Sequence, residues 1–193
     1  MQRFILGTFA VVVLILQTAG FTQSKQPPVL ATDITAAEVK AVLDAPPGTG
    51  DRLITAVDMG TYNVGVGVLR RNATKPGAPV SAINHEHITE VYYVISGSGT
   101  LVTGGTVTNP RPVAADSEIV KVVVGPSNTA TFDKAAQRRK VGPGDVVIIP
   151  PGVYHGFDEV ATSIEYLAVR PDPNKVLPAG YEHPALKAAR ATK

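Results

Sequence analysis

The stretch "HEHITEVYYVISGSG", residues 85–99, sets His85 and His87 close to Glu90, just ahead of an apolar run that ends in glycines. In a β-strand alternate side chains share a face, so the two histidines would point the same way. Glu90 follows after a short bend and would open the next strand. Imidazole and carboxylate groups are common ligands of divalent transition metals. The stretch is therefore either a metal site or the solvated face of an ordinary strand.

A second stretch, "GPGDVVIIPPGVYHGF" at residues 142–157, carries another histidine at a defined place. "DVVIIP" is typical of a buried strand between turn signals, and "PPG" favours a tight turn. His155 follows Gly152 by three residues. A turn of this kind fixes the backbone, so it would deliver one side chain to a set position.

The rest of the chain predicts an all-β fold. Short runs rich in Val, Ile, Thr and Tyr alternate with Gly, Pro, Asn and Asp, as in a sandwich or barrel. A short helix over residues 35–45 is indicated by a capping-box pattern of Thr35 and Glu38. Residues 104–115 are predicted to be a long surface loop, and "SGSGT" and "TGGT" to be hairpin turns. The expected strands are 52–60, 61–72, 78–84, 89–97, 99–105, 117–125, 128–134, 145–152 and 163–170.

Both quoted stretches resemble the two sequence motifs of the cupin superfamily. "GDVVIIPPGVYH" has Gly144, Pro150, Gly152 and His155 at the spacing of the second motif, although Glu159 stands where that motif closes with Asn. "HEHITEVYYVISGSG" is similar to the first motif, and the order of the two is right. The resemblance runs from Gly77 to Phe157. It implies a double-stranded β-helix, the jelly-roll barrel of cupins, that holds one divalent metal on His85, His87, Glu90 and His155.

One spacing departs from the family pattern and leaves two registers open. Cupins usually place three or four residues between the second His and the Glu, whereas two separate His87 from Glu90. In the first register His85 and His87 are both ligands and the loop is tightened. In the second, Ile83 fills the first-His position, His85 fills the second, and His87 lies in the turn. His85, Glu90 and His155 belong to the ligand set in both registers.

The metal would be Mn, Fe, Zn, Ni or Cu, because the chain has no cysteine to supply a soft ligand. The resemblance implies a metal-dependent enzyme on a small organic substrate, with dioxygenase, isomerase and lyase chemistry all open. The catalytic residues stay unknown at this stage. The alternative hypothesis is a non-catalytic module that binds or senses a small molecule. If Glu90 points inward, Tyr92 does too, as a proton donor or as a packed residue with a bonded hydroxyl.

The N-terminus has the order of a secretory signal peptide. Arg3 precedes the apolar run "FILGTFAVVVLIL", and small residues follow it. We therefore expect a secreted or periplasmic protein that keeps no membrane anchor after cleavage. The net charge of +2 does not argue for nucleic acid, so the expected partners are a small molecule and a second copy of the chain, as a homodimer. The predicted organisation is a signal peptide (1–24), a lead-in with a short helix (25–50), the cupin barrel (51–171) and an extended C-terminal tail (172–193).

Overall fold

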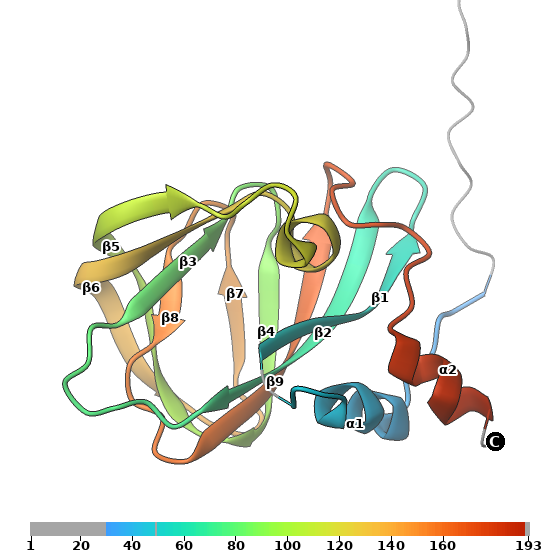
Figure 1. The fold of residues 1–193 in the computed structure, drawn as a ribbon, viewed down its shortest axis with the longest axis horizontal. Coiled ribbons are helices and arrows are strands. Elements are labelled where there is room, and N and C mark those ends of the chain that lie inside the picture. Colours follow the sequence, from blue (N-terminus) through green and yellow to red (C-terminus); the bar gives the residue numbers. More distant parts are fainter. Residues whose placement is uncertain (1–29, 49, 192–193) are drawn as a thin grey trace, which may run out of the picture.

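The computed structural model describes residues 30–48 and 50–191, and in them two antiparallel sheets enclose the main core (Figure 1). The predicted signal segment, residues 1–24, lies outside these ranges. The first sheet has the strand order β1-β2-β9-β4-β7, and the second is closed in the order β3-β6-β5-β8. This arrangement confirms the predicted all-β jelly-roll barrel. The strands are β1 (Gly50–Asp58), β2 (Asn63–Asn72), β3 (Ser81–His85), β4 (Glu90–Gly97), β5 (Gly99–Pro112), β6 (Ser127–Val141), β7 (Val146–Ile149), β8 (His155–Phe157) and β9 (Ser163–Asp172).

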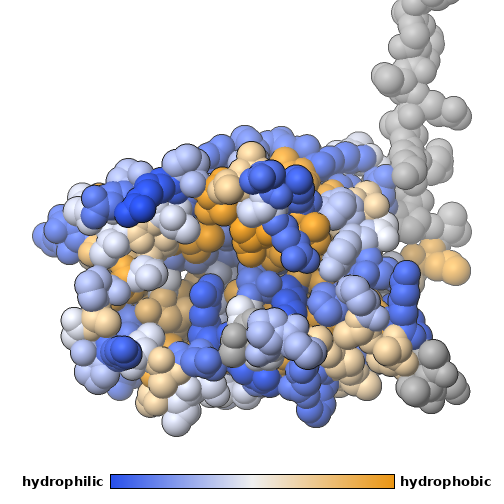
Figure 2. Space-filling model, in the orientation of Figure 1, coloured by the Kyte–Doolittle hydropathy of each residue, from blue (hydrophilic) through white to orange (hydrophobic). Residues whose placement is uncertain are grey.

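Strand alternation decides which side chains enter the barrel. On β4, Tyr92 and Val94 are 2% exposed while Tyr93 is 47% exposed, which confirms the inward parity predicted from Glu90. On β9 the buried positions alternate in the same way as far as Asp172. Figure 2 shows hydrophobic residues recessed on one face beneath hydrophilic ones. The largest core cluster comprises Leu69, Tyr92, Val94, Leu101, Val141, Val147, Ile149, Val160, Ile164, Tyr166 and Ala168.

The two α-helices lie together against the outer face of the first sheet (Figure 1). Helix α1 (Ala36–Asp44) begins at the predicted capping box, in which the Thr35 hydroxyl accepts from the Glu38 amide. Helix α2 (Pro184–Ala191) buries Leu186 with residues of α1 and of β1 and β2. The C-terminal segment, expected to be extended, is thus helical where it covers apolar sheet surface. No helix of the described ranges is long and apolar enough to cross a membrane.

The run "SEIVKVVVG" was predicted to be a strand, and that prediction was wrong. Residues Ile119–Val124 form the π-helix η1, with Val120, Val123 and Val124 buried. Their spacing of three and four places them on one helical face, which packs near β1. The β-propensity of valine is overridden here because packing decides the conformation.

The predicted loop over residues 104–115 is instead mostly strand. β5 continues to Pro112 and pairs with β6, with Val107 opposite Phe132. "TGGT" is not a hairpin turn, because Gly104 and Gly105 lie within β5, where register shifts follow. These positions are largely exposed, so no apolar alternation marks them as a strand. The three-residue strand β8 was also not predicted, because it is short and follows the Pro-Gly turn closely in the sequence.

Candidate metal centre

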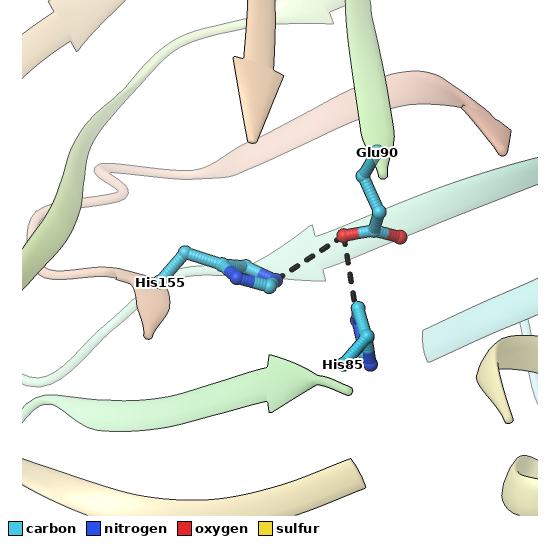
Figure 3. Close-up of side chains that lie close together, drawn as sticks. All are labelled: His85, Glu90 and His155. Carbon is cyan, nitrogen blue, oxygen red and sulfur yellow. Dashed lines mark ion pairs between the residues drawn. The ribbon is translucent and has the colours of Figure 1, made fainter. Parts of the chain in front are cut away.

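Three predicted ligands meet inside the barrel from three different strands (Figure 3). His85 ends β3, Glu90 begins β4 and His155 begins β8. Glu90 Oε2 lies 3.4 Å from His85 Nε2 and 3.2 Å from His155 Nε2. The three side chains are 4%, 1% and 3% exposed. The neighbouring strands β3 and β4 and the sequence-remote strand β8 therefore converge on one buried point.

Hydrogen bonds on the far side of each ring determine which imidazole nitrogen carries the proton. The Ser127 hydroxyl donates to the Gly125 carbonyl and lies 2.8 Å from His85 Nδ1, so it accepts from that nitrogen. His155 Nδ1 lies 3.0 Å from the Val153 carbonyl, which can only accept. Nδ1 of each ring is therefore the donor to these partners, and Nε2 of each ring faces Glu90. Such outer partners are what orient metal-ligating histidines in proteins.

Nε2 of both rings faces one carboxylate oxygen, an arrangement that suits a cation held between the three groups. His155 Nε2 is buried and has no hydrogen-bond partner among the described residues. Around a first-row metal with bonds of about 2.1 Å, neighbouring ligand atoms stand about 3–3.4 Å apart. The distances of 3.2 and 3.4 Å to Glu90 Oε2 agree with that spacing. The residues present therefore fit a divalent metal held by two imidazoles and one carboxylate.

The second oxygen of Glu90 is occupied by an arginine that sequence reasoning missed. Arg170 Nε donates to Glu90 Oε1 at 2.9 Å, and its Nη2 lies 2.5 Å from Asp51 Oδ2. The side chain is fully buried, and Gly67 makes room for it: a Cβ there would stand 2.5 Å from Arg170 Nη1. The alternation of side chains along β9 could have indicated this arginine, because Arg170 lies on the same inward face as Tyr166.

These neighbours also determine the charge of the site. Burial raises the pKa of Glu90, but the Arg170 guanidinium, together with the hydrogen bonds from His155 and His85 and the charge of His85, outweighs burial and holds that pKa well below its usual value. Glu90 is therefore a carboxylate. Burial, followed by the charge of Glu90, raises the pKa of Tyr92 well above its usual value. Tyr92 accordingly keeps its proton and donates to Glu90 Oε2 at 2.7 Å.

The fourth predicted ligand, His87, is not part of this group. It lies in the bend between β3 and β4 and is half-buried. Ile83 occupies β3 two residues before His85 and pairs with His155. This placement is that of the second register described above. His183, outside both motifs, accepts from the Ala185 amide at the start of α2.

A cavity of about 510 Å³ adjoins the centre. Its lining includes Ile83 and His155 but not His85 or Glu90. Tyr92 packs against both His155 and Tyr166, with ring centroids 6.0 and 4.4 Å away. Of the three grouped residues, His155 alone lines the cavity, and its Nε2 is itself buried.

Comparison with known proteins gives one family and several fold neighbours. A family model described as Cupin matches residues 52–178. No curated protein matches the chain. Among solved structures, BH2720 from Bacillus halodurans aligns with a TM-score of 0.47 and 13% identity, over 86% of this chain and 99% of that one. A Klebsiella pneumoniae protein with a double-stranded beta-helix domain aligns with a TM-score of 0.45 and 15% identity, over 75% of this chain and 93% of that one. DMSP lyase DddQ from Ruegeria pomeroyi aligns with a TM-score of 0.38 and 15% identity, over 63% of this chain and 46% of that one.

Proposed function

This chain belongs to the cupin family, and we propose that it holds one divalent transition metal on His85, Glu90 and His155 and acts with it on a small organic substrate. The observation that carries the proposal is the convergence of two imidazole Nε2 atoms on Glu90 Oε2 inside the barrel. The outer hydrogen bonds to Ser127 and Val153 hold that convergence in place. A metal with three protein ligands keeps open positions, where it supplies a Lewis acid for a bound substrate or water.

The protein's own residues prepare the centre in three ways. Arg170 holds Glu90 Oε1, which leaves Oε2 as the oxygen directed at the two rings. Tyr92 offers a hydroxyl proton at that same oxygen. The aromatic packing of Tyr92 and Tyr166 excludes water from one side. These features suit isomerase, lyase and oxygenase chemistry alike, so the reaction class awaits a substrate.

The test is elemental analysis of the purified protein, with reconstitution by Mn²⁺, Fe²⁺, Zn²⁺, Ni²⁺ and Cu²⁺. We expect about one equivalent of metal, lost in His85→Ala, Glu90→Gln and His155→Ala. His87→Ala is the matched control, since it removes a histidine two positions from His85, and it should retain the metal. Loss of metal in His87→Ala would instead make His87 a fourth ligand. A folded wild-type protein that takes up no metal would overturn the proposal.

One observation favours a second candidate function, a binding module without turnover. The Glu90 carboxylate is already satisfied by Arg170 and Tyr92, so the group has protein partners without a metal. Such a module would bind small molecules equally well before and after a chelator removes any metal from the protein. Turnover that disappears on chelation and returns with metal would exclude it.

The proposal includes export of the protein, supported by the charged and apolar N-terminal segment that precedes residue 24. N-terminal sequencing of protein recovered outside the cytoplasm should begin near residue 21 or 25. An intact Met1 on that protein would contradict cleavage.

A homodimer likewise stays a prediction. The valine-rich segments of η1 and β9 offer little surface for it, because Val123 is buried in η1 and Leu167 packs beneath the helices. Large exposed apolar residues lie instead on neighbouring strands, Tyr93 on β4 and Val146 on β7. Light scattering should show a dimer that Val146→Lys dissociates, and a wild-type monomer would refute this prediction.

A further inference from the structure

The cavity beside His155 combines apolar walls with free positive charge. Its volume is about 510 Å³, and the segment from the end of β2 to β3 forms much of its lining together with β8. Val80, Phe157 and Val160 supply apolar surface to it. Arg71 and Lys75 supply cations. A cavity of this size can enclose a small organic molecule.

Arg71 enters the cavity because of strand parity. It shares the inward face of β2 with Leu69, and its Nε donates to the buried Tyr166 hydroxyl at 3.1 Å. Its neighbour Arg70 points outward and pairs with Glu165 and Asp44. No carboxylate of the described ranges forms an ion pair with Arg71, although the side chain is half-buried.

The other charges of the cavity do not cancel that of Arg71. Lys75 has no acidic partner within the described residues and is exposed. The one carboxylate of the lining, Asp158, is already paired with Arg138. Within the described ranges, the two cationic groups of the cavity, Arg71 and Lys75, thus have no carboxylate in an ion pair with them.

We propose that this cavity binds an organic carboxylate, with the carboxylate on Arg71 and Lys75 and the apolar part against Phe157 and Val160. A planar guanidinium matches a carboxylate with two parallel hydrogen bonds. The apolar walls favour a carbon skeleton over a bare inorganic anion. Because His155 lines the same cavity, organic carboxylates are also the substrate class of the metal centre, and that extension alone rests on the proposed function.

Calorimetric titration of the chelator-treated protein with benzoate tests the inference separately from the metal. Benzamide is the neutral probe of the same shape, and inorganic phosphate is the anion without a carbon skeleton. We expect saturable benzoate binding that weakens about tenfold or more in Arg71→Gln, because a charge-assisted bond is lost. Arg139→Gln makes the same charge change at an exposed position outside the cavity and should bind like wild type.

Three results would overturn the inference: no benzoate binding, equal binding in Arg71→Gln, or tighter binding of phosphate or benzamide than of benzoate. Lys75→Gln provides a second variant at an exposed position that does not threaten folding, and it should weaken benzoate severalfold. Benzoate binding by a protein that takes up no metal would support the cavity and refute the metal centre. Metal uptake without carboxylate binding would do the reverse.

Discussion

Arg170 Nε donates to Glu90 Oε1 across 2.9 Å at a point in the barrel where neither side chain is more than 1% exposed. A buried ion pair of this kind persists only when both partners are also hydrogen-bonded. Asp51 provides that support for Arg170, and Tyr92 provides it for Glu90. The proposed metal ligand Glu90 and the folding of the barrel are therefore coupled through one arginine.

Removing Asp51 should weaken metal binding without removing a ligand. Asp51→Asn leaves the Arg170 cation less compensated beside Glu90, and that positive charge opposes a divalent metal. Changes to outer partners of this kind typically lower metal affinity about 10–100-fold. Titration with Co²⁺ or Mn²⁺ would measure the loss. Asp58→Asn, on the same strand and paired with Lys175, is the matched control. If Asp51→Asn lowers the melting temperature but leaves affinity unchanged, its role is structural only.

Ser127 should control the affinity of the site for its metal, because it orients His85. Ser127→Ala removes the acceptor of the Nδ1 proton and frees the ring to turn or to change tautomer. We expect metal affinity to fall about 10–100-fold, with one equivalent still bound at high metal concentration. Ser117→Ala, at an exposed serine that donates to the Ala114 carbonyl, should have no effect. Imidazole ¹⁵N shifts that are identical in wild type and Ser127→Ala would refute this role.

Gly67→Ala should destabilise the barrel because Arg170 cannot move away. The new Cβ would stand 2.5 Å from Arg170 Nη1 and 3.0 Å from the Arg52 carbonyl. Overpacking of this kind costs about 1–3 kcal/mol of the free energy of unfolding. Gly142→Ala is the control, since nothing lies within 4 Å of a Cβ there. Urea unfolding measures the stability of both variants, and equal unfolding midpoints would contradict the tight fit at Gly67.

Acid should loosen helix α2 through His183. Burial and, after it, the charge of Arg52 lower the pKa of His183 below its ordinary value of 6.5. The unfolded chain therefore binds a proton at a higher pH than the folded one, and stability falls as the pH drops through about 6.5. Protonation also removes the acceptor of the Ala185 amide.

His183→Asn keeps an acceptor at this position but does not titrate. Between pH 7.5 and 5.5 the wild type should lose more of its free energy of unfolding than this variant, by denaturant unfolding at each pH. Parallel losses in the two proteins would show that other groups cause the pH dependence.

Local patterns were enough to predict much of the fold. The alternation that begins at Glu90 placed Tyr92 inside and Tyr93 outside, because a strand repeats every two residues. The capping box of Thr35 and Glu38 marked the start of α1, because both hydrogen bonds lie within one turn. η1 was missed because β-branched residues favour strands in general, and burial of Val120, Val123 and Val124 requires a different fold of that segment here.

By itself, the sequence determined helix α1, most of the strands and the residues that compete to be metal ligands, since each depends on neighbours along the chain. Only the tertiary structure decided which of them meet. It places His85, Glu90 and His155 together and His87 in the bend, because β8 meets β3 and β4 from a remote part of the sequence. It also brings Arg170 and Asp51 to Glu90 from positions 80 and 39 residues away, a pairing that depends on strand order and on the space left by Gly67.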